Sequence, residues 1–478
     1  EFSIITNLLS EGTWMELKKV LKEKFNYDQF RPGQQEIIET ILEGDSVLGM
    51  LPTGTGKSLC YQLPGYLLEG TVVVISPLIS LMEDQVIQLQ GLGEKRAVAL
   101  NSLLSSWEKQ WILNEAHHYK FIFMSPEMFL SPNVQNVLKR VKLAMIVVDE
   151  AHCISQWGID FRPEYLKLAD GIQFVGSPLI LALTATATNE VRKDIQRLLF
   201  EKEKAREVVF SVDRPNISFF VYQENKVEKL RELMISLEGS GIIYCATRKK
   251  VEELYHSFKD RQKIAYYHGG LSGQERRMLQ QQFLSGELRI LVATNAFGMG
   301  INKENIRFVI HYDLPDSPEN YLQEVGRAGR DGQLSQAILL YEEGDEFIHH
   351  FLQEQTNQSK KLFEIKQKMS DLVFEDPLIK KWEQFFPNDS SHLMDLLSQR
   401  GVTKKKQLQK MLDYIATTKC RREFLVSYFD ESLTEKNPIC CDNDGAVLQK
   451  YSVQETASMG QISWQKIIQK IFKNTVKD

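Results

Sequence analysis

The stretch Leu51-Pro-Thr-Gly-Thr-Gly-Lys-Ser58 decides the fold of this chain, because it combines the end of a strand, a glycine loop and the start of a helix. An apolar run from Val47 to Met50 precedes the loop, and the helical pattern begins at Leu59. A junction of this kind points successive backbone N–H groups and a helix N-terminus at one spot, which suits a phosphate group. The stretch therefore predicts a nucleotide site.

The side chains of this P-loop have distinct expected roles. Lys57 would reach the β- and γ-phosphates of the nucleotide, and the Ser58 hydroxyl would ligate Mg²⁺. The general P-loop pattern places Gly six positions before the Lys, where this chain has Leu51. The other loop residues expected to bind the nucleotide are Thr53, Gly54, Thr55 and Gly56.

Length and composition limit the class of protein. A chain of 478 residues is too long for one hydrophobic core and suggests about three domains. A hydrophobic content of 43% with 25% charged residues is typical of a globular protein. The net charge of -5 means that a nucleic-acid site must be a local track of basic and polar groups. Without a long apolar run or a signal peptide, and with scattered cysteines, the chain is expected in the reducing cytoplasm, with no membrane contact.

Two segments alternate short apolar runs with helical patterns, which predicts two α/β domains, each with a parallel sheet buried on both faces. The first domain is expected at 13–210, with strands at 47–50, 71–76, 121–124, 144–148 and 179–183. The second is expected at 211–345, with strands at 217–221, 240–244, 264–267, 289–293, 307–311 and 337–341.

The remaining segments are predicted to be connecting or helical. Asp213-Arg-Pro-Asn216 is typical of a linker turn between the two domains. Residues 346–445 have a helical pattern, and 446–478 form a tail. Within the tail, the apolar spacing of Trp464 to Phe472 predicts a short amphipathic helix.

Ile146-Val-Val-Asp-Glu-Ala-His152 places two carboxylates at the end of a buried strand. In an open parallel sheet, ligands bind at the carboxyl edge of the strands. We expect Asp149 to hold Mg²⁺, directly or through water, and Glu150 to orient and deprotonate the attacking water. His152 is interpreted as a coupling group rather than a proton carrier. The alternative for such an acidic pair is a solvated strand end.

Two further groups of residues suit a nucleotide. Tyr27, Arg31 and Gln34 offer an aromatic plane, a guanidinium and an amide for adenine, although a helix-capping turn with a core aromatic explains them equally well. In Tyr321-Leu-Gln-Glu-Val-Gly-Arg-Ala-Gly-Arg-Asp-Gly332, the spacing predicts Arg327 and Arg330 on one face of a helix, near Gln323. Between glycine-rich turns, they are interpreted as arginine fingers that face the γ-phosphate, since surface arginines without such a setting are usually solvated.

Taken together, these motifs resemble the RecQ family of DNA helicases, within superfamily 2, over residues from about 14 to 441. Phe30-Arg-Pro-Gly-Gln34 resembles the adenine-reading motif of that family, and Pro52–Ser58 is similar to its own P-loop form, in which Leu51 is expected. Asp149-Glu-Ala-His152 matches the Mg²⁺ and water-activating motif, and Ala182-Leu-Thr-Ala-Thr186 matches the motif that links the two sites. The resemblance implies ATP and Mg²⁺ as cofactors and two tandem RecA-like domains.

The resemblance also implies residues that contact DNA. Cys153-Ile-Ser-Gln-Trp-Gly-Ile-Asp-Phe-Arg-Pro163 resembles the aromatic-rich loop that couples DNA binding to ATP hydrolysis, and Ile159 departs from the usual His there. Aromatic faces stack on bases at about 1–3 kcal/mol each, without regard to sequence. The residues assigned to DNA in this way are Ser76, Pro77, Ser125, Trp157, Phe161, Arg162, Thr247 and Thr294.

Near the C-terminus, Cys420-Arg-Arg-Glu-Phe-Leu-Val-Ser-Tyr-Phe-Asp430 and Cys440-Cys-Asp-Asn-Asp444 resemble the zinc-binding module of the family. Asp444 stands where the last of four cysteines is expected. Because zinc accepts carboxylate oxygen, Cys420, Cys440, Cys441 and Asp444 form one candidate site, and a module that has lost its metal is the alternative. Since 34 residues follow Asp444, a short, bacterial-type member without the winged-helix and accessory domains is expected.

The resulting hypothesis is an ATP-dependent DNA helicase that moves 3′ to 5′ on single-stranded DNA and unwinds duplex DNA in recombination and repair. ATP would close the cleft between the domains, and hydrolysis would reopen it. Expected partners are single-stranded and partly duplex DNA, with repair or replication proteins, for a monomer associated with the nucleoid. The alternatives are an RNA helicase and a non-catalytic nucleic-acid clamp that ATP switches.

Overall fold

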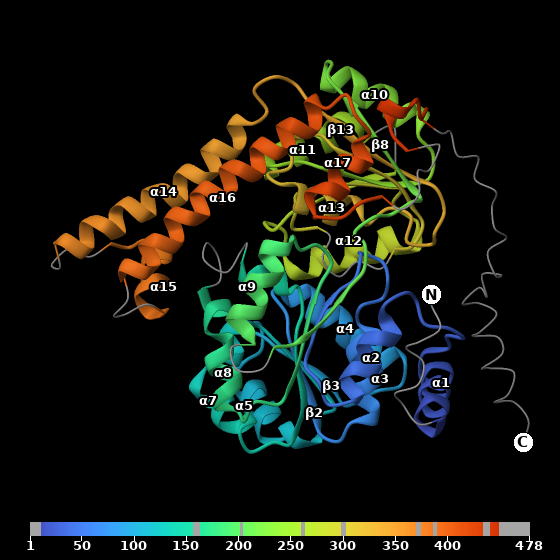
Figure 1. The fold of residues 1–478 in the computed structure, drawn as a ribbon. Coiled ribbons are helices and arrows are strands. Elements are labelled where there is room, and N and C mark those ends of the chain that lie inside the picture. The colour runs from blue at the N-terminus through green and yellow to red at the C-terminus, as the bar shows by residue number, and fades with distance from the viewer. Residues whose placement is uncertain are drawn as a thin grey trace, which may run out of the picture.

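The computed structural model describes residues 11–155, 163–200, 204–259, 263–297, 303–369, 374–385, 390–433 and 440–448. In these ranges the chain forms two domains stacked one above the other, and two long helices project from the side of the upper domain (Figure 1). Each domain is built on one parallel sheet. The predicted fold class, two parallel-sheet domains followed by a helical region, is confirmed.

The first domain contains a seven-stranded parallel sheet in the order β3-β4-β2-β5-β6-β1-β7. Its strands are β1 (Val47–Met50), β2 (Thr71–Ile75), β3 (Ala97–Leu100), β4 (Phe121–Met124), β5 (Leu143–Val148), β6 (Leu179–Thr184) and β7 (Arg206–Val209). Its helices are α1 (Glu11–Phe25), α2 (Gln34–Leu42), α3 (Leu59–Leu67), α4 (Ile79–Gly91), α5 (Ser106–Asn114), α6 (Pro126–Phe129), α7 (Pro132–Leu138), α8 (Leu168–Phe174) and α9 (Asn189–Leu199), with 3₁₀ turns at Ala116–His118, Ala151–Ile154 and Pro163–Lys167.

The central strands are apolar along their whole length because helices cover both faces of the sheet. Every residue of β1, β2 and β4 is buried, and the core side chains fall into separate clusters. The two edge strands β3 and β7 were absent from the sequence prediction. Both are four residues long. β3 is the apolar run Ala-Val-Ala-Leu, which the prediction missed, whereas β7 is mostly exposed and begins with two charged residues.

The second domain contains a six-stranded parallel sheet in the order β10-β11-β9-β12-β13-β8. Its strands are β8 (Ile217–Tyr222), β9 (Ser240–Tyr244), β10 (Ile264–Tyr267), β11 (Ile290–Ala293), β12 (Ile306–His311) and β13 (Ser335–Leu340). Its helices are α10 (Lys226–Ser236), α11 (Arg248–Phe258), α12 (Gly273–Ser285) and α13 (Pro318–Val325). The six runs predicted here all coincide with strands, with ends shifted by at most two residues.

The helical region consists of α14 (Phe347–Lys368), α15 (Pro377–Phe385), α16 (Ser390–Ala416) and α17 (Arg421–Tyr428), followed by a 3₁₀ turn at Asp442–Asp444. Figure 1 shows α14 and α16 side by side as a long projecting pair, with α15 at its far end. A small core around Trp382 fills that end and includes Leu166 of the first domain. The predicted amphipathic helix at Trp464–Phe472 lies outside the described residues.

Helix α17 and the residues after it contact both domains. Phe429 belongs to the hydrophobic core of the first domain, whereas Leu425 belongs to that of the second. Just after the helix, a carboxylate oxygen of Asp430 accepts a hydrogen bond from the backbone N–H of Asn189 at 3.1 Å, and Glu431 accepts one from Val212 at 3.2 Å. Helix α17 and the residues after it, here called the C-terminal module, therefore connect the two domains and the linker between them.

Candidate active site at the domain cleft

The P-loop, residues 51–58, connects β1 to α3 in the first domain. Gly54 and Gly56 have φ angles of 86° and 77°, a left-handed conformation that residues with a Cβ rarely adopt. Leu51 is fully buried in the core beneath the loop, and a Cβ built on Gly33 would lie 2.3 Å from its Cδ2 atom. The leucine that departs from the general pattern therefore anchors the loop, and it leaves no room for a side chain at Gly33.

The three residues assigned to adenine lie directly beside the P-loop. The Gln34 amide donates hydrogen bonds to the carbonyl oxygens of Thr55 and Gly56 at 2.7 and 3.0 Å, and the Arg31 guanidinium donates one to Gly54. The polar groups of Gln34 and Arg31 thus hold the loop backbone in this structure. Tyr27 is 52% exposed and lines the cavity next to the loop, where its ring is accessible to a base.

The predicted carboxylates follow β5 on the same sheet edge. Glu150 has a φ angle of 49°, a strained conformation for a residue with a side chain that is often found at functional sites. Burial and the neighbouring Glu150 charge raise the pKa of Asp149 to about 7. Two adjacent carboxylates and a serine hydroxyl on the wall of the same cavity offer only oxygen ligands, which suits Mg²⁺. Ser58, Asp149 and Glu150 line one cavity, so the donor set fits this ion.

His152 connects the acidic motif to the end of β6. Its Nδ1 atom lies 3.0 Å from the Thr184 hydroxyl and 3.4 Å from a carboxylate oxygen of Glu150. Burial lowers the pKa of His152, which favours the neutral imidazole at neutral pH. A neutral ring between a carboxylate and a hydroxyl supports the interpretation of a coupling group, which stays a prediction.

The arginine loop, residues 326–330, presents the second half of the site. The sequence placed Arg327 and Arg330 on one face of a helix, and this is wrong, because α13 ends at Val325 and both arginines lie in the turns that follow. Gly329, with a φ angle of 58°, adopts the left-handed conformation within these turns. Even so, Arg327, Arg330 and Gln323 of α13 all reach the same cavity.

The arginine loop lies directly on the P-loop. A Cβ built on Gly326 would lie 1.7 Å from the Thr53 hydroxyl oxygen, and one built on Gly54 would lie 2.8 Å from Cγ of Arg330. Both positions require glycine because backbone and side chain of opposite domains touch there. The two domains are therefore in a closed arrangement.

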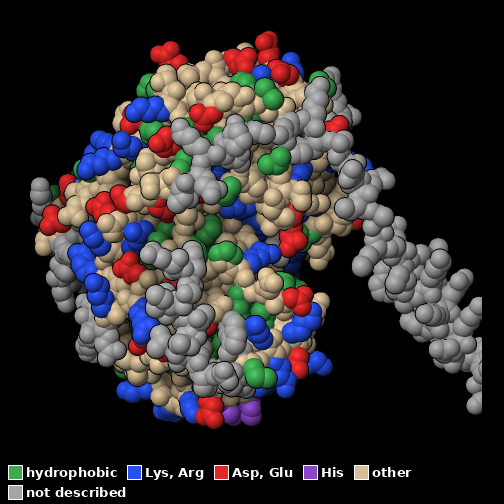
Figure 2. All heavy atoms as spheres, turned by 45° about the vertical axis from the view of Figure 1, so that its right-hand side comes forward, with side chains coloured by type: hydrophobic (Ala, Val, Ile, Leu, Met, Phe, Trp, Pro, Cys, Tyr) green, Lys and Arg blue, Asp and Glu red, His purple; other side chains and the backbone are tan. Residues whose placement is uncertain are grey.

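The cavity between the domains has a volume of about 260 Å³ and unites the predicted half-sites. It also includes residues that the sequence did not single out, among them the polar residues Gln62, Gln85, Gln88 and Glu304, which belong to no phosphate-binding or acidic motif. The predicted residues that line it are Tyr27, Arg31, Gln34, Thr53, Gly54, Gly56, Lys57, Ser58, Asp149, Glu150, Gln323, Arg327 and Arg330. In Figure 2 the surface is hollowed between the two domains, and basic and hydrophobic side chains lie around the hollow.

The electrostatics of this cavity favour an anion. Burial, together with the positive charges of Arg327 and Arg214, lowers the pKa of Arg330 to about 9. Like charges that are buried together destabilise each other unless a counter-charge lies between them. Because Lys57 lines the same cavity, a triphosphate fits the charges that the protein places there.

The residues assigned to DNA lie at the carboxyl ends of strands in both sheets. Ser76 and Pro77 follow β2, Ser125 follows β4, and Thr294 follows β11. Thr247, after β9, caps α11 by accepting a hydrogen bond from the Lys250 N–H at 3.2 Å, and Ser125 caps α6 in the same way. Two of the proposed DNA contacts therefore already serve as helix caps. The predicted contacts Trp157, Phe161 and Arg162 lie outside the described residues.

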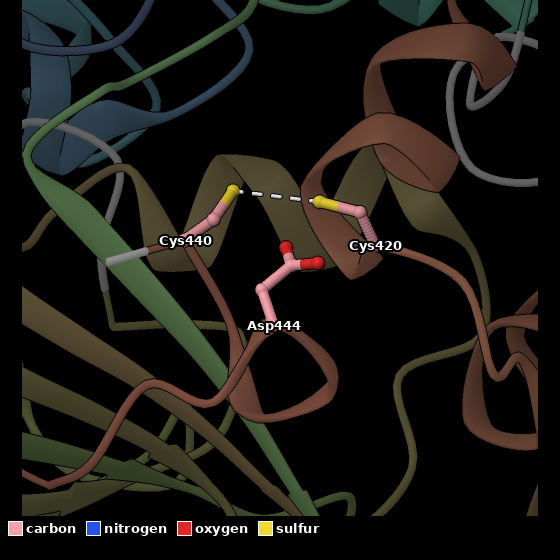
Figure 3. Close-up of side chains that lie close together, drawn as sticks. All are labelled: Cys420, Cys440 and Asp444. Atoms are coloured by element: carbon pink, nitrogen blue, oxygen red, sulfur yellow. Dashed lines mark hydrogen bonds between the residues drawn. The ribbon is translucent and has the colours of Figure 1, made fainter. Parts of the chain in front are cut away.

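The cysteine cluster lies beside β8, the edge strand of the second sheet. The Sγ atoms of Cys420 and Cys440 are 3.4 Å apart, and Figure 3 shows the Asp444 carboxylate pointing toward the space between them. Ligand atoms of these three residues all lie within 4.8 Å of one another. Cys441 is not in that group, although its Sγ atom lies 3.3 Å from an Asp444 oxygen.

This arrangement fits zinc, which combines sulfur and carboxylate ligands in a tetrahedron. Burial raises the pKa of Cys420 and of Cys441 to about 11, so the thiols are protonated at neutral pH unless a cation is bound. Cys420, Cys440 and Asp444 would hold the ion, with Cys441 as the candidate fourth ligand. Such an ion would cross-link the start of α17 to the segment that runs beside β8.

We expect the purified protein to contain about one zinc ion per chain, measured by elemental analysis. Cys440→Ala should remove the metal and lower the unfolding temperature, because metal binding stabilises the folded state.

Asp444→Cys should slow the loss of zinc to a chelator, since thiolate binds zinc more tightly than carboxylate. Cys245→Ala, at a buried cysteine far from the cluster in sequence, is the control and should keep the metal. A zinc-free wild-type protein that is as stable as the metal-treated one would contradict the assignment.

Comparisons with known proteins cover both sheets and the cysteine module. A DEAD/DEAH box helicase model matches residues 31–195, a helicase conserved C-terminal domain model matches 225–332, and a RecQ zinc-binding model matches 380–444. The described residues contain no helix that is both long and apolar enough to span a membrane.

Whole-chain relatives give the same assignment. The chain is 41% identical to a protein of Bacillus subtilis described as probable ATP-dependent DNA helicase RecS, over 95% of this chain and 98% of the relative. It is 38% identical to the ATP-dependent DNA helicase RecQ of the same organism, over 90% of this chain but 66% of that longer protein. Among solved structures, the DUF1998 helicase MrfA bound to DNA matches with a TM-score of 0.59 at 20% identity, over 72% of this chain and 53% of that one, which shows a shared fold.

Proposed function

The chain belongs to the RecQ family of ATP-dependent DNA helicases, and on this premise we propose that it couples ATP hydrolysis to 3′-to-5′ movement on single-stranded DNA and to duplex unwinding. The observation that carries the proposal is the shared cavity between the domains. It combines the P-loop and two carboxylates of one domain with Arg327 and Arg330 of the other. Neither domain alone offers a complete site for phosphoryl transfer.

The predicted catalytic residues of the first domain each have a proposed task in hydrolysis. The amides of the P-loop and Lys57 bind the β- and γ-phosphates, and Ser58 and Asp149 would hold Mg²⁺. When bound, Mg²⁺ neutralises charge on the phosphate oxygens. Glu150 orients the attacking water and accepts its proton.

The second domain supplies the remaining charge stabilisation. Arg327, Arg330 and Gln323 line the same cavity, and we assign the two arginines to the γ-phosphate, where they would stabilise the charge that develops on its oxygens. Arginine fingers of this kind contribute about 10³–10⁵ in rate. Because these residues reach the P-loop only when the domains are closed, hydrolysis depends on closure.

Movement along DNA follows from the same dependence. The candidate DNA contacts Ser76 and Ser125 lie on the first domain, and Thr247 and Thr294 lie on the second. If ATP closes the cleft and product release opens it, the two sets of contacts approach and separate once per cycle. If each domain binds the strand with a different affinity in the open and the closed state, the cycle moves the DNA in one direction.

The direction of movement and a role in recombination and repair rest on family membership. We propose that the protein works as a monomer on single-stranded and partly duplex DNA in the cytoplasm, in contact with other repair or replication proteins. The free cysteines, all buried, are consistent with a reducing compartment.

We predict that Lys57→Ala and Glu150→Gln each lower DNA-stimulated ATP turnover by about 10²-fold or more, because they remove a phosphate ligand and the general base. Single-stranded DNA binding should stay close to the wild-type level, since neither side chain is a proposed DNA contact. Steady-state ATP hydrolysis and fluorescence anisotropy of a labelled oligonucleotide measure the two quantities. Lys95→Ala and Glu287→Gln, at exposed positions, are matched controls. Wild-type turnover in either active-site variant would overturn the catalytic assignment.

Unwinding assays on tailed duplexes test the direction and the type of nucleic acid. We expect ATP-dependent separation of a duplex with a 3′ single-stranded tail, little separation with a 5′ tail, and stimulation of ATP hydrolysis by DNA above that by RNA. Preferred unwinding of the 5′-tailed duplex would contradict the proposed direction. Stronger stimulation by RNA would favour an RNA helicase, and DNA binding without any turnover would favour a clamp.

A further inference from the structure

The linker Asp213-Arg-Pro-Asn216 does more than connect the two domains. The Nη1 group of Arg214 donates hydrogen bonds to the carbonyl oxygens of Thr53 at 2.7 Å and Gly326 at 3.3 Å. Its Nη2 group donates to those of Ala328 at 3.1 Å and Gly329 at 2.7 Å. One guanidinium therefore joins the P-loop of the first domain to the arginine loop of the second.

The carbonyl groups that Arg214 binds flank the two candidate catalytic arginines in the sequence. Arg327 lies between Gly326 and Ala328, and Arg330 directly follows Gly329, so Arg214 holds the backbone on both sides of Arg327 and just before Arg330. Asn216 adds a hydrogen bond to the Gly329 carbonyl at 2.8 Å. The position of the arginine loop relative to the phosphate site is thus set by a side chain that lies outside both loops.

A second arginine, Arg422 of α17, holds the linker from which Arg214 projects. Its Nη1 group donates to the Asp213 carboxylate at 2.6 Å and to the Arg214 carbonyl at 2.8 Å, and its Nη2 group donates to the Ile217 carbonyl. Arg422 is 1% exposed, and its Nε–H lies 2.9 Å from the Sγ atom of Cys440. The C-terminal module therefore fixes the backbone on both sides of Arg214.

This junction is tightly packed but only partly buried, since Arg214 itself is half-buried. The cavity there measures about 20 Å³ and is lined by residues of the P-loop, the linker, the arginine loop and α17, among them Thr53, Arg214, Gly326 and Arg422. A space of this size holds about one water molecule. Because the hydrogen bonds of Arg214 are part-buried, water can reach the carbonyl groups when its side chain is removed, so the loss falls on the position of the loop rather than on the folded state.

We propose that Arg214 is a positioning residue for ATP hydrolysis, which sets the arginine loop against the P-loop, and that Arg422 keeps it in place. This inference rests on the proposed function, because it assigns Arg214 to the step that Arg327 and Arg330 catalyse. Lysine cannot replace Arg214, since a single ammonium group cannot span acceptors that the two Nη groups reach separately.

The test compares Arg214→Ala and Arg214→Lys with wild type in steady-state ATP hydrolysis at saturating single-stranded DNA. We expect kcat to fall by about 10²-fold in both variants, because a small displacement of a catalytic group has an effect of this size. The KM for ATP, the affinity for a fluorescent ADP analogue and the unfolding temperature should stay unchanged. Arg206→Ala is the control, since its ion pairs to Glu43 and Asp45 stay within the first domain, and it should behave as wild type.

Three results overturn the inference. Wild-type kcat in Arg214→Ala shows that the bridge is not needed, and full activity in Arg214→Lys shows that one cationic group suffices. A loss of kcat that is matched by equal losses of nucleotide affinity and thermal stability shows a general structural role. If Arg214→Ala does not fold, Asp213→Asn is the deciding variant. It weakens the ion pair between Asp213 and Arg422 without a change in side-chain volume. An unchanged kcat in Asp213→Asn would then refute the proposed role of Arg214. Failure of the proposed function is recognised separately, since the wild-type protein would then show no DNA-stimulated hydrolysis.

Discussion

The contact between Gly326 and Thr53 across the cleft is the constraint on which the rest of the structure depends. At this point the arginine loop of one domain lies against the P-loop of the other without space for a single added carbon atom. Because the two loops are so close, residues about 270 positions apart in the chain line one cavity. The linker acts on the same contact, since Arg214 binds the backbone of both loops that form it, and Arg422 of α17 in turn binds the linker.

The charged groups in the cavity destabilise the closed arrangement of the domains when no ligand is bound. The same charges favour the binding of a ligand with complementary charges. On one side, burial raises the pKa of Asp149, and on the other it lowers the pKa of Arg330. Both shifts show that the ionised groups lack full solvation. A metal-bound triphosphate supplies a cation beside the carboxylates and anions beside the guanidinium groups, so its binding favours closure of the domains.

The sequence predicted the parts of the fold and site that depend on local patterns. Continuous apolar runs revealed the central strands, and the glycine loop with Lys57 and the acidic pair revealed the first half-site. The edge strand β7 has no such run, and the apolar and charged pattern around the arginines did not show that α13 ends at Val325. The role of Arg214 was not predictable either, because its acceptors are backbone carbonyls of two loops, one from each domain, that only the tertiary structure brings together.

The central claim is that the active site is complete only when the second domain contributes its arginines. Steady-state ATP turnover of Arg327→Ala at saturating single-stranded DNA tests this claim most directly. The account predicts a fall in kcat of about 10³-fold or more, with the affinity for a fluorescent ADP analogue close to that of wild type. Turnover near the wild-type rate would show that the first domain hydrolyses ATP without the second, and would contradict the account.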